Sequence, residues 1–120
     1  MTIELNTEGY KLLAEIGFLG ISRGMAQQAE VVFSALHRLR PEEETGPIGL
    51  ALTHLAANEA QAAVQVLEKA RQSDTIIAFR CLAHARLGDR DTARELRDEL
   101  HETGAAETLT AMADGALAEA

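Results

Sequence analysis

The sequence repeats its own pattern of residue types at an interval of 34 residues, and this repeat limits the fold more than any other feature. When the chain is shifted by that interval, apolar residues fall on apolar residues, and small residues fall on small or flexible ones. The matching pairs are Ile16-Gly17 with Leu50-Ala51, Gly24 with Asn58, Ala29 with Ala63, Phe33 with Leu67 and Leu36 with Ala70. A repeat of this length is one supersecondary unit, which buries its apolar face only by stacking on its neighbours.

A third copy of the pattern follows at a shorter interval of 30 residues. The matching pairs are Leu52 with Leu82, His54 with His84, Asn58 with Gly88, Ala63 with Ala93, Val66 with Leu96 and Ala70 with Leu100. The third copy has therefore lost about four residues before its first helix. Such a stack needs about three repeats for stability, and 120 residues leave room for little else.

The first copy resembles the tetratricopeptide repeat, in which an aromatic residue, a Leu-Gly pair, a second aromatic residue, an Ala, a Phe and a Pro stand at fixed spacing. Those positions hold Leu13, Ile16-Gly17, Gly20, Ala29, Phe33 and Pro41. Tetratricopeptide repeats are helical hairpins, so the resemblance implies an all-α, tetratricopeptide-like array of three hairpins.

The small residues have physical roles that fit this array. Helix backbones approach closely only where side chains are small, and the small residues predicted to allow this are Gly17, Ala29, Ala51, Ala63 and Ala93. Gly24, Asn58 and Gly88 stand where a helix would end in a left-handed residue. Spacing and residue chemistry therefore predict the same turns.

Residues that typically begin or end helices predict seven helices in a single domain, 1–120. The expected ranges are about 7–22, 25–39, 46–57, 60–72, 75–87, 90–102 and 105–118, with repeats at 10–41, 45–72 and 75–102. Asn6 or Thr7 should cap the first helix, Gly46-Pro47 open the third, Asp74 cap the fifth and Gly104 end the sixth. The last segment, 105–118, should cap the stack, with a frayed tail as the alternative.

Composition excludes several classes of partner. The formal charge is −8, with 19 acidic residues against 11 Lys and Arg, so nucleic acid and anionic membranes are poor partners. The single Cys81 excludes an internal disulfide, and the start at Met1–Leu5 has no features of a secretory signal. No apolar run is long enough to span a bilayer. We therefore expect a soluble, cytoplasmic protein.

We predict no catalytic residue, no metal and no cofactor. The phosphate-binding, nucleophile-elbow and zinc-protease motifs are absent, and Cys81 has no activating partner in its neighbourhood of sequence. His54 and His84 occupy equivalent repeat positions, but two ligands without a third do not make a zinc site. The acidic run at 42–44 precedes a helix, where negative charge is stabilised by the dipole.

Tetratricopeptide arrays bind partners on the surface formed by the first helix of each hairpin. The residues that the repeat register places there are Ala14, Phe18, Ile21, Ile48, Leu52, Leu55, Ala78, Leu82 and Arg86. A carboxylate ligand needs charge-assisted donors, and Ala14, Phe18, Ile48 and Leu52 in the central band supply none. This apolar band suits the apolar face of an amphipathic helix instead. Ile21, Leu55 and Leu82 have an alternative as residues of the core between helices.

Three stretches resemble the small tetratricopeptide chaperones of bacterial type III secretion, closest to those that hold the needle subunit. The stretches are Leu12–Gly20, Gln27–Glu30 and Cys81–Gly88. The resemblance implies a groove that grips an amphipathic helix of the needle subunit and prevents its premature polymerisation, and a small helical co-chaperone on the amino-terminal repeat. A chaperone of translocator subunits and a general scaffold or adaptor remain alternatives. Without its ligand, the chain could form a homodimer through the groove.

Overall fold

The computed structural model describes residues 5–118, and all regular structure in that range is helical. The predicted domain also includes residues 1–4 and 119–120, which lie outside the described residues, as does most of the Met1–Leu5 stretch. The helices are α1 (Thr7–Ser22), α2 (Ala26–Leu39), α3 (Thr45–Ala56), α4 (Ala60–Lys69), α5 (Asp74–Leu87), α6 (Arg90–Glu102) and α7 (Glu107–Ala118). The prediction of an all-α array of seven helices is therefore confirmed.

At the starts of α1, α5 and α6, a side chain accepts a hydrogen bond from a backbone N–H group that has no partner inside the helix. The Asn6 side chain accepts a hydrogen bond from Gly9 N at 2.7 Å, which confirms one of the two predicted caps of α1. The predicted cap at Asp74 is wrong, because the preceding Ser73 accepts from Ile76 N. Asp74 is the first residue of α5, where its charge is still favoured by the helix dipole.

Four turns between helices contain a residue in the left-handed conformation. The φ angles are 75° at Gly24, 63° at Asn58, 92° at Gly88 and 71° at Gly104. Asn58 is the one residue with a Cβ atom among them, and asparagine tolerates this region better than most residues. The predicted turns at Gly24, Asn58 and Gly88, and the predicted end of the sixth helix at Gly104, are confirmed.

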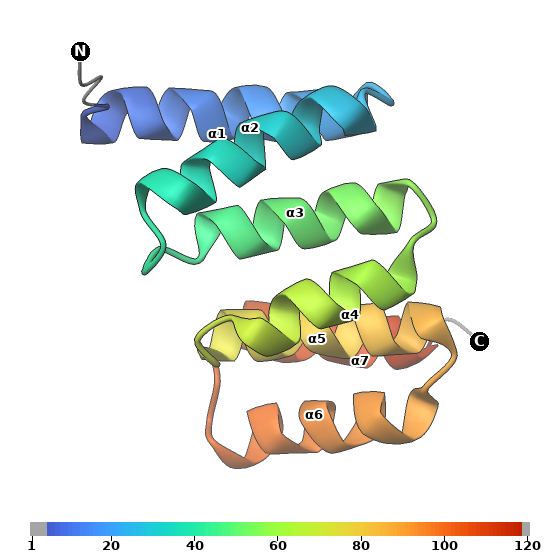
Figure 1. Ribbon diagram of the computed structural model, residues 1–120. Coiled ribbons are helices and arrows are strands. Elements are labelled where there is room, and N and C mark those ends of the chain that lie inside the picture. The colour runs from blue at the N-terminus through green and yellow to red at the C-terminus, as the bar shows by residue number, and fades with distance from the viewer. Residues whose placement is uncertain (1–4, 119–120) are drawn as a thin grey trace.

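The helices form three hairpins, α1/α2, α3/α4 and α5/α6, which follow one another along the molecule (Figure 1). Each new hairpin begins by packing its first helix on the second helix of the preceding one, α3 on α2 and α5 on α4. The last helix, α7, packs on both α5 and α6. It is an ordered helix that covers the last hairpin, so the alternative of a frayed tail is wrong and the capping prediction is confirmed.

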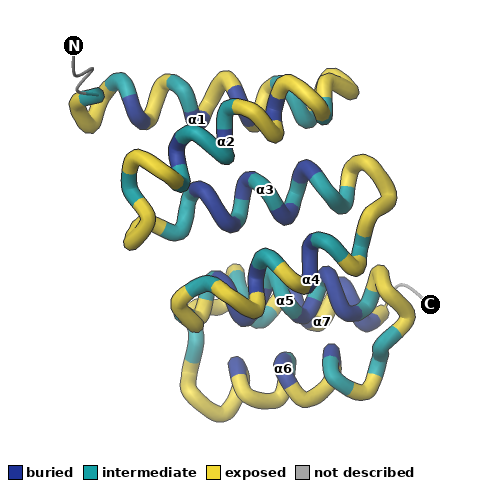
Figure 2. Tube along the Cα trace, viewed as in Figure 1, coloured by how far each residue is buried: buried dark blue, intermediate teal, exposed yellow. Residues whose placement is uncertain are grey.

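The buried side chains form three clusters, one for each hairpin, and buried segments lie on the sides of the helices that face each other (Figure 2). The third cluster includes residues of α7, among them Ala113 and Leu117. Arg90, at the start of α6, donates a hydrogen bond to the Leu117 carbonyl and fastens α7 to the hairpin. The stack is therefore closed at its carboxy-terminal end by the chain itself.

The fully buried Phe33 joins the first two hairpins. A Cβ atom at Gly17 in α1 would lie 2.7 Å from its ring, and a Cβ atom at Gly49 in α3 would lie 2.1 Å from it. The ring therefore fills space that only glycine leaves open, on two sides at once. Phe18 covers a further side, with ring centroids 4.7 Å apart and the ring planes tilted by 57°.

Replacing Gly49 should destabilise the fold strongly for so small a change. The substitution Gly49→Ala places a methyl group against a ring that cannot swing away, because Gly17 and Phe18 confine its other sides. We expect a loss of about 1–3 kcal/mol, typical of overpacked cores. Urea unfolding followed by circular dichroism measures it. Gly115→Ala in α7 is the matched control, because nothing lies within 4 Å of its added Cβ, and it should be neutral or stabilising. Equal midpoints for both variants would contradict this packing.

Candidate protein-binding surfaces

Three of the predicted partner-binding residues form a set that we call the inner row: Phe18, Leu52 and Leu82. They occupy equivalent positions on α1, α3 and α5, the first helices of the three hairpins. Phe18 is 36% exposed, and Leu52 and Leu82 are half-buried. Because α1 contacts α3 and α3 contacts α5, the row runs along one side of the stack. Each hairpin thus contributes one apolar side chain that solvent reaches.

The structure places two other predicted groove residues in the core. Ala14 is buried beneath α2, in the cluster that contains Phe33. Ala78 has no exposed surface, because α7 packs over this part of α5. For these two positions the prediction of a partner contact is wrong. The register placed them correctly on the first helices, but it could not show how far α7 reaches across α5.

The remaining predicted residues are divided between core and surface. Ile21, Ile48 and Leu55 are partly buried and pack against the clusters of the first and second hairpins, which agrees with the core alternative for Ile21 and Leu55. Arg86 is exposed near the carboxyl end of α5. Leu52 and Leu82 have the same intermediate exposure as these three partly buried residues, but they are not packed against a core cluster of the described residues. The inner row is therefore the part of the predicted apolar surface that is least engaged by the core.

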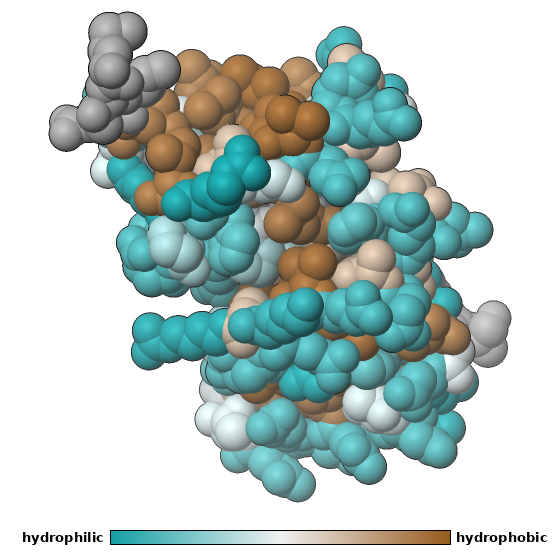
Figure 3. Space-filling view, in the orientation of Figure 1, coloured by the Kyte–Doolittle hydropathy of each residue, from teal (hydrophilic) through white to brown (hydrophobic). Residues whose placement is uncertain are grey.

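The largest group of exposed apolar side chains lies elsewhere, on the outer side of the α1/α2 hairpin. We call this surface the end face. Space-filling atoms of apolar residues gather over the α1/α2 end of the molecule, whereas the α6 end is mostly hydrophilic (Figure 3). The residues of the end face are Leu12 (57% exposed), Ile16 (48%), Leu19 (51%), Met25 (45%) and Leu39 (51%), with the partly buried Leu13 and Val32.

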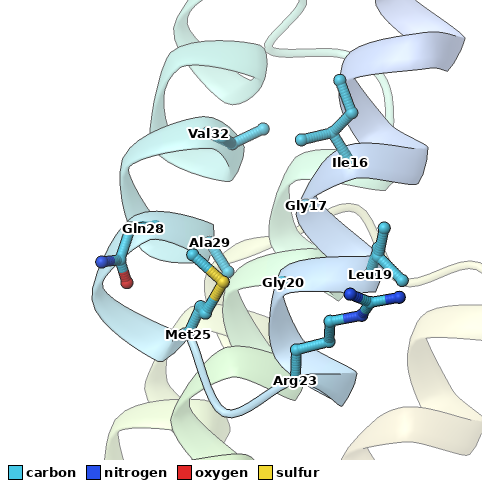
Figure 4. Close-up of a pocket in the computed structure, with 9 residues that line it drawn as sticks. All are labelled: Ile16, Gly17, Leu19, Gly20, Arg23, Met25, Gln28, Ala29 and Val32. Atoms are coloured by element: carbon cyan, nitrogen blue, oxygen red, sulfur yellow. The ribbon is translucent and has the colours of Figure 1, made fainter.

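Two hollows lie on the end face along the line where α1 meets α2. One has a volume of about 220 Å³ and is flanked by Ile16 and Val32, whose side chains approach each other across it (Figure 4). Gly17, Gly20 and Ala29 also line it, and these small residues leave the hollow open between the two helices. The other, of about 380 Å³, lies beside Leu13 and Leu39 at the opposite end of the hairpin. Both are shaped to receive apolar side chains.

The sequence carried a signal for the end face that our prediction did not use. Leu12, Ile16 and Leu19 recur at intervals of four and three residues, which places them on one line along α1. At the N-cap of α2 and within this helix, Met25, Val32 and Leu39 recur every seven residues, which is one step of four plus one of three and again gives a single line. These lines are separate from the core lines of the same helices, and an amphipathic helix with two apolar lines has two apolar neighbours.

Three histidines pair with carboxylates, two at turns within hairpins and the third, His101, with Asp114 of α7 at 3.0 Å. His54 Nδ1 lies 3.0 Å from Glu59 and the buried His84 Nδ1 lies 3.3 Å from Asp89, at the equivalent turns of the second and third hairpins. The Thr92 side chain and backbone, followed by the nearby His84, hold the pKa of Asp89 below its usual value. These contacts fasten each turn to its first helix, and within residues 5–118 no three His, Cys, Asp or Glu residues are grouped as a metal site requires.

The acidic run at 42–44 is tied to the next hairpin. Glu44 accepts a hydrogen bond of 2.7 Å from the Ser73 hydroxyl, the same residue that caps α5. Together with Arg71 and Gln72, the acidic run lines a hollow of about 400 Å³. The hydrogen bond joins two loops of the stack, which is a structural role.

Comparison with known proteins does not assign the chain to a family. No protein-family model and no curated protein matches the sequence. Within the described range, no helix has the length and apolar character that crossing a membrane requires. The surfaces themselves therefore carry the argument about function.

Cys81 should be chemically inert while the protein is folded. Its thiol is fully buried and donates a 3.3 Å hydrogen bond to the Ala93 carbonyl, and burial raises its pKa above the usual value of 9.0. We expect no reaction with a thiol reagent at pH 8 until urea unfolds the chain. Because the unfolded thiol ionises first, its contribution to stability is present below about pH 9 and is lost as the pH rises through the native pKa. Cys81→Ala should remove that part of the pH dependence, and fast labelling of the native protein would contradict the burial.

Proposed function

We propose that this chain is a protein-binding chaperone that holds an amphipathic helix of a self-assembling export substrate against the inner row. The single observation that carries the proposal is the inner row itself. Phe18, Leu52 and Leu82 present one accessible apolar side chain from each hairpin at equivalent positions. An amphipathic helix offers apolar side chains at regular intervals, which is the pattern that such a row accommodates.

The surroundings of the inner row support an apolar ligand. Solvent-exposed cations lie on the two outer helices of the row, Lys11 seven residues before Phe18 on α1 and Arg86 four residues after Leu82 on α5. The row itself has no charged side chain that would bind a carboxylate or a phosphate. A helix with an apolar face and acidic flanks fits this arrangement of charges best.

The resemblance to type III secretion chaperones supplies the specific form of the proposal. The substrate would be a needle-like subunit whose helix polymerises when free, and covering that helix would keep the subunit monomeric in the cytoplasm. A small helical co-chaperone would bind at the amino-terminal repeat. A chaperone of translocator subunits and a general adaptor remain the alternatives, and they share the same surface.

Co-expression with the products of neighbouring genes tests the proposal. We expect one short helical protein to become soluble only in the presence of this chain and to co-purify with it in a fixed ratio. The double variant Phe18→Glu/Leu52→Glu should abolish this capture, because two charges would have to be buried against the apolar face of the substrate helix. Circular dichroism of the variant alone shows whether it remains helical. If it does not, the double variant Leu52→Glu/Leu82→Glu replaces it, because this variant leaves the contact between Phe18 and Phe33 intact.

A matched control separates the inner row from general surface apolarity. Val31→Glu changes an apolar residue that is 69% exposed on α2, away from the inner row, and should leave capture intact. If every neighbouring product is soluble alone and none co-purifies, the chaperone proposal is wrong. If Val31→Glu and the inner-row variants weaken capture equally, the substrate does not bind at the inner row.

A further inference from the structure

The two ends of the stack differ in whether a helix of the described chain covers them. At the carboxy-terminal end, α7 covers the α5/α6 hairpin and buries Ala113 and Leu117 against it. At the amino-terminal end, the described chain leaves the end face open, with Leu12, Leu19 and Leu39 each more than half exposed. Exposed apolar patches of this kind mark sites of association. The end face and the inner row share no residue, so each can bind its own partner.

The apolar residues of the end face have the spacing of a helical bundle. One line begins at Met25, the N-cap of α2, and continues through Gln28, Val32, Ala35 and Leu39 in alternating steps of three and four residues. The other joins Leu12, Ile16 and Leu19 of α1 with the C-cap Arg23 in the same steps, and Gln28 and Arg23 are the polar members of the two lines. This is the spacing with which side chains interdigitate between helices that cross at a small angle. Two antiparallel helices that each present such a line on the same side resemble half of a four-helix bundle. What completes such a bundle is another pair of helices.

Charges along the borders of the end face are self-complementary. Glu8 and Glu15 share a line with Leu12 and Leu19 on the border of α1. Arg38 lies on the opposite border, near the end of α2, and lines the hollow beside Leu39. Because the hairpin is antiparallel, Glu8 and Arg38 stand at the same end of it, on opposite borders. One acidic and one basic border at the same end is what a two-fold symmetric contact needs.

We propose that, in the free protein, the end face is covered by the end face of a second copy of this chain. A two-fold axis parallel to the helices places α1 of one copy over α2 of the other, antiparallel. Glu8 then meets Arg38 of the second copy, twice by symmetry, and Arg23 faces the neutral amide of Gln28. An axis perpendicular to the helices would instead bring the acidic borders together, which is repulsive.

The size of the end face is sufficient for a specific dimer. At 1.5 Å per residue, the 16 residues of α1 span about 24 Å. Two helices packed side by side are roughly 20 Å wide. The flat footprint is therefore on the order of 500 Å², and the accessible area lost is larger because side chains interdigitate. Stable complexes bury about 800 Å² per partner, so the end face falls in the range of a reversible dimer.

Sedimentation equilibrium of the purified chain tests the proposal. We expect a concentration-dependent species with twice the 12.9 kDa monomer mass. Ile16→Glu should raise the dissociation constant roughly a hundredfold, because it buries an unpaired charge at the centre of the contact. Leu12→Glu, at a more exposed position, is the second variant if the first does not fold. Leu87→Glu is the control, since this exposed residue ends α5 far from the end face, and the dimer should survive it.

A charge exchange tests the arrangement of the two copies. Glu8→Arg and Arg38→Glu should each weaken the dimer, and the double variant should restore it to within about threefold of the original, because the pair is rebuilt with its signs reversed. A chain that stays monomeric at all concentrations overturns the proposal. So does a dimer that Leu52→Glu breaks and Ile16→Glu does not, because its contact is then the inner row. A double variant weaker than both single variants excludes the proposed axis. None of these results depends on whether an export substrate binds.

Discussion

The contact between Phe33 and the two glycines that flank it decides how the first two hairpins stack. A phenyl ring reaches from α2 into both α1 and α3 because Gly17 and Gly49 have no side chain in its way. The backbone of α3 also approaches α2 closely at Gly46, where an added Cβ would lie 2.7 Å from the Cβ of His37. Close packing of this kind fixes the angle between hairpins, and that angle decides which side chains of α1 and α3 remain on the surface.

The contact between the second and third hairpins places its larger residue on the other helix. The position of Phe33 is occupied by Leu67 in the second repeat, and the position of Gly49 is occupied by Phe79 in the third. Phe79 packs against the cluster that contains Leu67. The first contact therefore has the large Phe33 on the second helix and no side chain at Gly49 on the next hairpin. The second contact has the smaller Leu67 and the large Phe79 at the same two positions. Leu67 and Phe79 together are larger than Phe33 and Gly49, so each contact has its own packing and the repeat pattern alone does not determine it.

This difference between the two contacts shows which features of the fold could be predicted from the sequence and which could not. Turns and helix ranges depend on local chemistry, and residues such as Gly24 and Asn58 showed them directly. Gly49 has no counterpart in the repeat pattern, since Glu15 and Phe79 stand at the equivalent positions, so its role appears only when its neighbour Phe33 is known. Ala78 was assigned to the groove for the opposite reason. The repeat register gave its helix and its side correctly, but its burial depends on α7, which belongs to no repeat.

The open end of the stack follows from the way hairpins are added. Each first helix packs on the second helix of the hairpin before it, so α1 has a surface made for a helix that the described chain does not supply. At the other end, α7 meets the same need. A helix placed before α1 would contact residues equivalent to those that α3 presents to α2, but Leu12 and Glu15 stand where α3 has Gly46 and Gly49. An occupant of the end face therefore cannot approach as closely as α2 approaches α3, and a looser contact of interdigitating side chains between separate molecules fits this surface better than one more repeat.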